Sequence, residues 1–462
     1  MAASIEQVNM TEGALLPKVL RFSLPLAATG VLQLLFNAAD VIVVGKFAGA
    51  TALAAVGATT ALINLLVNAF MGISVGVNIL VARYLGCRED ERVRACVHTA
   101  FALSLLLGLV VMAAGLTLST PMLELMKTPK DVLPLSSLYL RIYFLGIPGT
   151  IMYNFGAALL RAFGDTKRPM LFLTISGIVN ACLNLFFVIV CGMSVDGVAT
   201  ATVISQYISL FLVVRCLRRS EGLSHLELKS IRLDREESLR MIQIGLPAGL
   251  QSTLFSISNV LIQSSVNSFG ASVVAANTAA SNIEGFIYTA MNSVFHAAIT
   301  FTSQNLGAGK LSRTKRVYGS CIATSLMIGL PMCLVYFLFA PSLLSIYVSS
   351  ADPSYQDVIN YGLIRMRWLG CFQFLGGLME DACGMVRGLG KSWLPMFVTG
   401  IGACLSRIIW IYTVFQAVHT PEVLYLSYPM SWILTALMHV VCFILTYRNL
   451  AQRLANRPSA AT

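Results

Sequence analysis

The chain has 462 residues, of which 56% are hydrophobic and only 11% are charged, with 32 Lys and Arg against 21 Asp and Glu. Soluble globular domains carry about 25% charged residues, so this composition excludes that class and indicates a multi-span membrane protein. The formal net charge of +11 does not indicate a nucleic-acid-binding protein, because the basic residues lie in short gaps between apolar runs.

Twelve apolar segments are long enough to cross a bilayer, whose hydrocarbon core of about 30 Å takes about 20 helical residues. The first half of the chain predicts transmembrane helices over residues 19–46, 52–83, 93–119, 133–162, 168–191 and 195–217. The second half predicts them over residues 239–268, 273–305, 315–340, 355–388, 392–417 and 423–448. We therefore expect an all-α integral membrane protein with 12 transmembrane helices.

The distribution of Lys and Arg predicts the orientation of these helices. Most of the 32 basic residues fall in alternate gaps, and the longest charged segment lies in mid-chain, over residues 215–242. Short cytoplasmic loops are enriched in Lys and Arg, so the pattern places both termini, the linker 218–238 and the tail 449–462 in the cytoplasm. The linker is expected to be solvated and partly helical, and binding of its basic residues to anionic lipid is the alternative.

The two halves of the chain resemble each other. At one constant offset along the sequence, Ala54-Ala55 recurs as Ala275-Ala276, and Leu85-Gly86 recurs as Leu306-Gly307. At a slightly longer offset, Arg161, Gly164 and Pro169-Met170 recur as Arg387, Gly390 and Pro395-Met396. Because six helices separate equivalent points, both copies enter the bilayer from the same side, as parallel repeats do. We expect two pseudo-symmetric six-helix bundles around a central cleft, with an N-lobe over residues 1–217 and a C-lobe over residues 239–448.

The first apolar segment contains an acid, Asp40. A carboxylate inside a membrane helix costs about 2.5–3.5 kcal/mol on insertion scales, so its default interpretation is a functional group that faces a cavity. Asn37 lies three residues earlier on the same helix face, which favours this interpretation. The alternative is an acid at the membrane surface. In the functional interpretation, protonation of Asp40 is coupled to a rearrangement of the helices.

Two amides on the fifth predicted helix, Asn180 and Asn184, are four residues apart and therefore project from one face. Polar side chains inside membrane helices line a site or hydrogen-bond to a neighbouring helix, and the spacing does not decide between these roles.

The second half carries three acids within apolar spans, Glu284, Glu380 and Asp381. Glu284 has no charged residue within one helical turn, which favours a cavity-facing role in binding a cationic substrate. Glu380 lies seven residues before Arg387 on one helix face, so a structural pair is the alternative for this acid. Arg407 also lies in mid-span and needs a counter-charge, and Asp381 is the first choice for a structural ion pair.

These segments resemble a known family. The opening LPLAATGVLQLLFNAADVIVVGKF, the two Leu-Gly pairs, the segment AANTAASNIEGFIYTAMNSVFHAAITFTSQNLGAGK and the paired Arg-x-x-Gly and Pro-Met elements together resemble the multidrug and toxic compound extrusion (MATE) transporters. The prokaryotic DinF-like branch is the most similar. The resemblance covers nearly the whole chain, and its specificity lies in the order of the motifs across both repeats.

The resemblance implies a secondary active antiporter that exports amphipathic, often cationic, organic compounds in exchange for H⁺ or Na⁺ by alternating access. It implies a cation- or proton-coupling site at Asp40, with Asn180, Asn184 and Thr202 as its polar partners. Some members carry a second carboxylate where this chain has Asn184, which puts Na⁺ coordination in doubt. Some members place a cation-site Glu on the seventh helix, where this chain offers Gln251, Asn259 and Gln263 instead, so that version of the site does not transfer. The candidates for binding substrate or cation in the C-lobe are Glu284, Glu380, Asp381 and Gln251.

We expect a protein of the plasma (inner) membrane of a prokaryote, functional as a monomer, with a small organic substrate, the bilayer as its surroundings, no nucleic-acid partner and no cofactor. No metal site is predicted, because the 11 cysteines are scattered without Cys-x-x-Cys spacing. The alternative function is a flippase or exporter of a lipid-linked or polar metabolite in the same wider superfamily. An enzyme is not expected, because the few histidines show no catalytic motif.

Overall fold

The computed structural model describes residues 9–126, 128–347 and 355–456, and within these residues every regular element is a helix. The first half of the chain forms α1 (Leu15–Val43), continued by the π-helical η1 (Val44–Ala48), α2 (Ala50–Cys87), α3 (Asp90–Leu125), α4 (Leu133–Ala162), α5 (Lys167–Leu185), continued by the π-helical η2 (Phe186–Val190), and α6 (Val195–Arg219). Each of the six spans predicted for this half is occupied by one of these helices.

The second half repeats this order with more interruptions. It consists of η3 (Gly222–Ser224), η4 (Leu228–Ser230), α7 (Arg235–Asn267), α8 (Ala271–Gly307), α9 (Leu311–Leu338), α10 (Ala340–Ser345), α11 (Tyr355–Arg365), η5 (Met366–Gly370), α12 (Gln373–Gly388), α13 (Trp393–Thr399), η6 (Gly400–Leu405), α14 (Ser406–Tyr412), α15 (Val414–Ala417) and α16 (Pro421–Ala455). The fourth predicted span of this half is α11, η5 and α12 in succession, and the fifth is α13, η6 and α14.

Nine helical segments of the described residues are long and apolar enough to cross a membrane. The remaining long segments, α7, α8 and the succession from α11 to α12, carry more polar side chains. Together they confirm the prediction of six long helices in each half.

The internal repeat predicted from sequence is visible in the backbone. Positive φ angles recur at the two offsets that relate the halves: Gly49 (+91°) with Gly270 (+95°), Arg88 (+60°) with Gly309 (+71°), and Gly164 (+91°) with Gly390 (+90°). Glycine adopts this left-handed region without steric cost, which explains its use at five of the six positions. The turns that end equivalent helices therefore have the same geometry in both halves.

The described chain packs as two compact units. One contains Ala28–Gly249, and the other contains Met10–Ala27 together with the chain from Leu250 onward. The chain passes from one unit to the other at two points, and both lie inside a helix: in α1 shortly after Pro25 and in α7 shortly after Pro247. Proline lacks an N–H and removes one helical hydrogen bond at each of these points. The packed units therefore differ from the predicted lobes 1–217 and 239–448, which follow the repeat.

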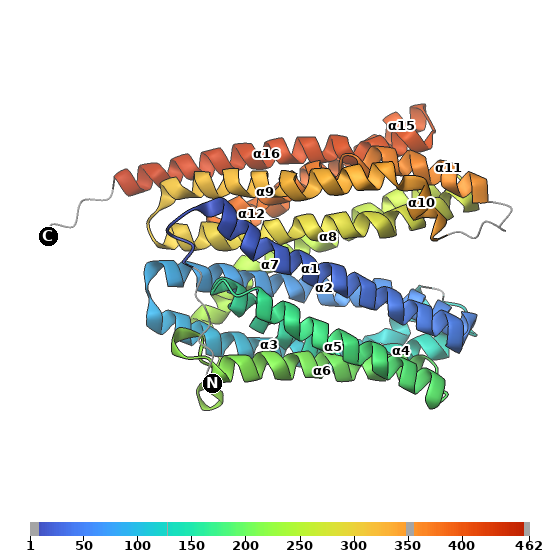
Figure 1. Ribbon diagram of the computed structural model, residues 1–462, viewed down its shortest axis with the longest axis horizontal. Coiled ribbons are helices and arrows are strands. Elements are labelled where there is room, and N and C mark those ends of the chain that lie inside the picture. Colours follow the sequence, from blue (N-terminus) through green and yellow to red (C-terminus); the bar gives the residue numbers. More distant parts are fainter. Residues whose placement is uncertain (1–8, 127, 348–354, 457–462) are drawn as a thin grey trace. The chain divides into compact units, whose positions relative to one another are not determined.

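In the first unit α4 packs against α2, α3 and α6, and α5 packs against α6 (Figure 1). The beginning of α7 crosses α2 at very short range. A Cβ built at Gly72 would lie 2.2 Å from the backbone nitrogen of Gly249, and one at Gly76 would lie 2.8 Å from that of Gly245. Small residues four apart on both helices permit this approach of the backbones.

The mid-chain linker contains the short helices η3 and η4, and it also contacts α3 of the first unit. Leu226 is 1% exposed. The backbone N–H of Glu227 donates to His98 Nε2 (3.2 Å), and that of Asp234 donates to Thr99 Oγ1 (3.4 Å). Both acceptors lie on α3, so α3 holds the linker at two points.

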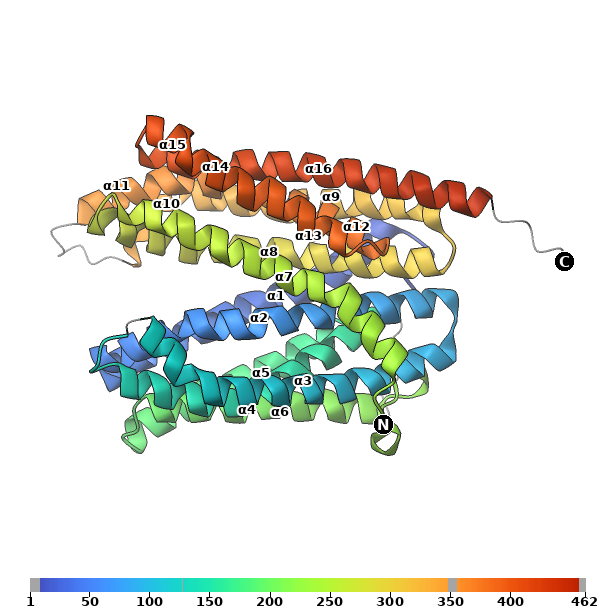
Figure 2. The same cartoon turned by 180° about the vertical axis from the view of Figure 1, so that it is seen from behind.

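In the second unit α12 packs against α8, α9 and α16, and α13 and α14 lie along α16, as Figure 2 shows. The beginning of α1 completes this unit by packing on α8. The Phe22 ring meets the Phe301 ring edge to face, with centroids 5.7 Å apart. Leu15 and Val19 are buried in the same apolar cluster.

Candidate functional site

A cavity of about 250 Å³ lies inside the first unit, between α1, α4, α5 and α6. Its lining is rich in polar and aromatic side chains: Gln33, Phe36, Asn37, Asp40, Tyr139, Tyr143, Thr150, Tyr153, Asn154, Leu173, Ser176, Gly177, Asn180, Thr202, Ser205, Gln206 and Ser209. A polar cavity within a membrane-spanning bundle is unfavourable unless it holds water or a polar ligand, which makes it the candidate site.

Helix α1 contributes to the cavity with one face. Its lining residues occupy positions i, i+3, i+4 and i+7 of the helix: Gln33, Phe36, Asn37 and Asp40. This spacing places them in one row along the helix. The prediction that Asp40 faces a cavity, with Asn37 beside it, agrees with this geometry. The row lies close to α5, because a Cβ built at Gly177 would lie 2.0 Å from Phe36 Cε2.

Asp40 is held by two amides of α5. Asn184 Nδ2 donates a hydrogen bond to Asp40 Oδ1. The Asn180 amide has two orientations, and with its nitrogen turned to Asp40 it donates to Oδ1 at 2.8 Å and to Oδ2 at 3.3 Å. Within the described residues no Lys, Arg or His forms an ion pair with Asp40. The site is therefore a carboxylate whose partners are neutral N–H donors rather than a fixed cation.

Thr202 on α6 is a weaker partner. In the other orientation of the amide, Asn180 Nδ2 donates to Thr202 Oγ1 at 3.4 Å, near the upper limit for a hydrogen bond. The same hydroxyl donates to the backbone oxygen of Val198 at 2.9 Å. The four residues predicted as a coupling site thus lie together, with Thr202 at the edge of the contact network.

Several acceptors around the cavity have no protein partner. Among the described residues, Asn184 Oδ1, Gln206 Oε1 and Thr150 Oγ1 are buried without a hydrogen bond. Buried polar atoms are nearly always satisfied by protein, water or a bound ion. These oxygens make the neighbourhood of Asp40 suited to water, to a proton in transit or to a small cation.

Both helices that carry the acid and its amide partners change to π-helical geometry directly beyond the site. The segment η1 begins four residues after Asp40, and η2 begins two residues after Asn184. Short π-helical turns inside α-helices occur frequently at functional sites, because they re-aim side chains and free backbone groups. This irregularity in two of the four helices supports the assignment of the cavity as the site.

In the second unit Glu284 is not the unpaired, cavity-facing acid expected from sequence. Arg365 donates to both of its carboxylate oxygens, from Nε to Oε1 at 3.1 Å and from Nη2 to Oε2 at 2.7 Å. Tyr336 Oη donates to Oε1 at 3.2 Å, and Arg365 Nη1 also donates to Asn277 Oδ1. Glu284 and Arg365 are each 6% exposed. The contacts form a satisfied buried ion pair, and η5 begins at the next residue after Arg365.

The remaining candidates of this unit lie on or beside α12. Asp381 is fully buried and accepts from Ser325 Oγ at 2.6 Å. Gln251 Oε1 accepts a hydrogen bond from Arg387, which lies near the end of α12. Glu380 is buried and, among the described residues, makes no hydrogen bond or ion pair. The alternative of a Glu380–Arg387 ion pair is therefore not realised in this geometry.

Arg407 does not pair with Asp381, which corrects the proposed structural ion pair. Its Nε donates to Ser431 Oγ at 2.8 Å, and its guanidinium carbon lies 4.3 Å from the ring centroid of Tyr428. A hydroxyl acceptor and an aromatic face provide the stabilisation that a carboxylate was expected to give.

Sequence reasoning missed the contribution of α4 to the cavity. Four of its residues line the cavity from one helix face, at positions i, i+4, i+11 and i+15: Tyr139, Tyr143, Thr150 and Asn154. A stripe of polar and aromatic residues in a membrane helix was the available signal. Gln206 on α6 belongs to a similar row, because Thr202, Ser205 and Ser209 line the cavity from the same helix face, and this polar stripe was a second available signal.

Comparisons with known proteins agree with this architecture. The sequence model of the family described as MatE matches residues 25–186 and 247–413, so it matches both halves of the chain. The chain is 29% identical to "Probable multidrug resistance protein YoeA" of Bacillus subtilis (strain 168), over 72% of this chain and 74% of that protein. It is 25% identical to "FAD transporter" of Shewanella oneidensis, over 75% and 77%. The solved structure "Crystal structure of MATE in complex with MaL6" has the same fold, with a TM-score of 0.87, 22% identity and coverage of 97% of this chain and 99% of that chain.

Proposed function

Because the chain belongs to the MATE family of membrane transporters, we propose that it is a secondary active antiporter that exports amphipathic, cationic organic compounds by alternating access. Relatives from Bacillus subtilis are named probable multidrug resistance proteins, which supports export of varied organic compounds. Members of this family are transporters and not enzymes. The second candidate is export of a polar metabolite, which the similarity to the Shewanella oneidensis FAD transporter favours.

We propose Asp40 as the group that binds the coupling ion. The observation that carries this proposal is a carboxylate in a polar cavity whose hydrogen-bond donors are the amides of Asn180 and Asn184. A carboxylate without a fixed counter-cation becomes neutral when it takes up a proton or binds Na⁺. Either event changes the charge of the cavity and the hydrogen bonds that α5 makes to α1.

The orientation of the two amides supports H⁺ rather than Na⁺. Hard cations bind several oxygen ligands. Asn184 turns its nitrogen to Asp40, and Asn180 does so in one of its two orientations; in that orientation N–H donors occupy positions that Na⁺ would need to fill with oxygens. A proton needs no such change, because one carboxylate oxygen is enough to hold it.

The cellular setting is part of the proposal. Alternate loops rich in Lys and Arg support a plasma membrane location with both termini in the cytoplasm. We propose that the monomer is the working unit. The expected partners are a small organic substrate and the bilayer, with no role for nucleic acid and no cofactor beyond the exchanged ion.

Export of the fluorescent cation ethidium from energised cells tests the proposal. Asp40→Asn keeps the size of the side chain and removes its charge and proton exchange, and we expect export to fall to the level of cells without the protein. Asp131→Asn is the matched control, because Asp131 is an exposed acid in the connection between α3 and α4. Export by Asp40→Asn at the wild-type rate, with equal amounts of protein in the membrane, would contradict the role of Asp40.

A further inference from the structure

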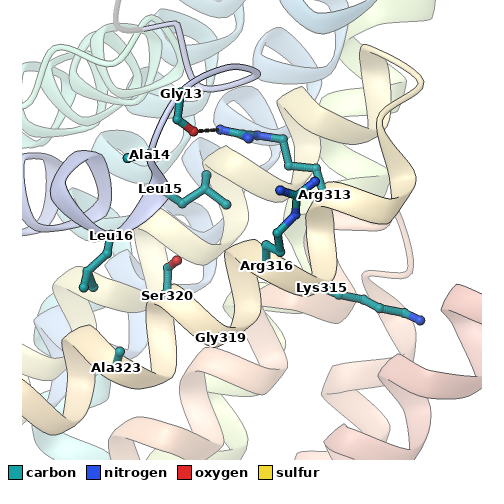
Figure 3. A pocket seen from close by; sticks show the side chains of 10 residues that line it. All are labelled: Gly13, Ala14, Leu15, Leu16, Arg313, Lys315, Arg316, Gly319, Ser320 and Ala323. Atoms are coloured by element: carbon teal, nitrogen blue, oxygen red, sulfur yellow. Dashed lines mark hydrogen bonds between the residues drawn. The ribbon is translucent and has the colours of Figure 1, made fainter.

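A second cavity lies in the other unit, away from the residues that line the Asp40 cavity. It has a volume of about 580 Å³ and is formed where the chain enters α1 and where α9 begins (Figure 3). Ten residues line it: Gly13, Ala14, Leu15, Leu16, Arg313, Lys315, Arg316, Gly319, Ser320 and Ala323. Three of the ten are basic, none of the ten is acidic, and most of the others are small or apolar. We call it the α1–α9 hollow.

The basic side chains of the hollow make different contacts. Arg313 Nη2 donates to the backbone oxygens of Glu12 (2.8 Å) and Gly13 (2.7 Å), and this contact shapes one wall. Figure 3 shows Arg313 reaching Gly13, whereas Lys315 points away from the other lining residues. The Lys315 ammonium lies 4.2 Å from the ring centroid of Tyr447. Lys315 therefore serves the contact with α16 rather than the hollow.

Arg316 carries the free charge of the hollow. Its side chain is exposed and, within the part of the chain that the structure describes, makes no hydrogen bond or ion pair. Arg313 Nε is also buried without a partner among the described residues. The nearest acid along the chain, Glu12, has a partner of its own, Lys310, at 3.5 Å. The hollow thus offers the exposed guanidinium group of Arg316, with the positive charge of Arg313 in its wall and no carboxylate among its lining residues.

An apolar path leads away from this basic rim along α9. Ala323, Met327, Leu330 and Leu334 follow at spacings of four, three and four residues, so they form one stripe on the same helix face. Met327 and Leu334 are each 57% exposed, and Leu330 is 47% exposed. Exposed apolar side chains on a membrane-spanning helix contact lipid tails.

The neighbouring helix α1 carries a parallel stripe. Leu16 lines the hollow, and Leu20 and Leu24 follow at spacings of four residues on the same face. Leu24 is 55% exposed. The hollow is therefore continuous with two apolar stripes, which gives it the form of a site for a charged head with two hydrocarbon chains.

The depth of the hollow suits a lipid headgroup. The candidate spans of α1 and α9 begin at Leu15 and Leu311, so the hollow lies where both helices enter the membrane. Basic residues at this level attract anionic lipids by about 1 kcal/mol per Lys or Arg. A soluble phosphate compound would use the guanidinium groups but would leave the apolar stripes without a function.

From these features we infer that the α1–α9 hollow binds one anionic phospholipid. The phosphate contacts the exposed guanidinium group of Arg316, the headgroup occupies the space between Leu16 and Ser320, and the acyl chains run along the stripes of α1 and α9. Bound there, the lipid joins the start of α1 to α9 inside one unit. This site is independent of the transport function proposed for the Asp40 cavity.

Native mass spectrometry of the purified protein, with phosphatidylglycerol or phosphatidylcholine added to the detergent, tests the inference. We expect one phosphatidylglycerol to bind more tightly than any phosphatidylcholine. Arg316→Gln should weaken its binding about fivefold, the factor that corresponds to about 1 kcal/mol per basic residue. Ala323→Phe should also weaken it, because the larger side chain fills the hollow without changing the charge.

Arg94→Gln is the matched control, because Arg94 is exposed in the first turns of α3 as Arg316 is in the first turns of α9. It should leave the binding constant unchanged. Circular dichroism and size-exclusion chromatography establish that each variant is folded. Equal binding of the two lipids, an equal loss in Arg94→Gln, or wild-type binding by both Arg316→Gln and Ala323→Phe would overturn the inference. Binding of glycerol phosphate as tightly as phosphatidylglycerol would overturn it in favour of a soluble anion.

Discussion

Replacement of Arg365 by Met gives a quantitative test of the buried network in the second unit. The substitution keeps an unbranched apolar stem and removes the guanidinium group. Glu284 then loses the two donors at 3.1 and 2.7 Å and keeps only the Tyr336 hydroxyl at 3.2 Å. Asn277 Oδ1 loses the Arg365 donor as well and keeps only the Tyr425 hydroxyl at 3.3 Å.

The expected cost follows from these contacts. Hydrogen bonds to charged groups contribute about 1.5–3 kcal/mol each, and breaking a buried ion pair costs about 3–5 kcal/mol because one charge stays buried without its partner. Glu284 and Arg365 are each only 6% exposed, so solvent does not compensate for the loss. We expect Arg365→Met to lower the free energy of unfolding by about 3–5 kcal/mol. The double variant Glu284→Met with Arg365→Met should be less destabilised than Arg365→Met alone, since no charge is then left unpaired.

Unfolding in denaturing detergent, followed by circular dichroism, measures these differences. Arg367→Met is the control, because Arg367 lies two residues away and is exposed. A surface substitution of this kind should change the free energy of unfolding by less than about 0.5 kcal/mol. Equal stability of Arg365→Met and Arg367→Met would refute the reasoning, as would a double variant whose loss equals the sum of the two single losses.

Two further predictions concern the cavity of the first unit. Asn184→Ala removes the donor to Asp40 and should lower the rate of ethidium export about tenfold or more, the factor for a hydrogen bond to a charged group. Thr202→Val should change the rate of ethidium export less than about twofold, because the contact of Thr202 to the Asn180 amide is long, at 3.4 Å. Equal effects of Asn184→Ala and Thr202→Val would show that the loss of export does not come from the hydrogen bond to Asp40. Gly177→Ala places a Cβ 2.0 Å from Phe36 Cε2 and should destabilise the protein by about 1–3 kcal/mol and slow export. Wild-type stability and export of this variant would mean that α1 and α5 do not need their close contact.

The arrangement of helices was predictable because length and hydropathy are local properties of the sequence. Each predicted span contains a helix, and the offset that pairs Leu85 with Leu306 in the sequence also pairs the backbone of Gly49 with that of Gly270. The π-helical turns were not predictable, because they depend on how a helix packs and not on its composition. The first part of α1 packs with the second unit, and the first part of α7 packs with the first unit. This arrangement was also not predictable, because it depends on tertiary packing.

The candidate site was predictable in part. Asp40 was found because an acid in an apolar helix is costly, and its amide partners were found through the family resemblance and their spacing of four residues. The partner of Glu284 was missed because Arg365 lies 81 residues away in the sequence, where helical periodicity carries no information. Arg407 was assigned a carboxylate partner on charge alone, and a serine hydroxyl and an aromatic ring satisfy it instead.

Ion movement in proteoliposomes tests most directly the central claim that Asp40 binds the coupling ion. Purified protein is reconstituted in vesicles with a pH-sensitive dye inside, and an outward proton gradient or an outward sodium gradient is imposed separately. We predict that an outward proton gradient drives ethidium uptake by the wild type, that a sodium gradient alone drives no uptake, and that Asp40→Asn shows neither ethidium uptake nor substrate-driven proton movement. Proton-coupled uptake by Asp40→Asn, or uptake by the wild type driven by sodium alone, would contradict the account.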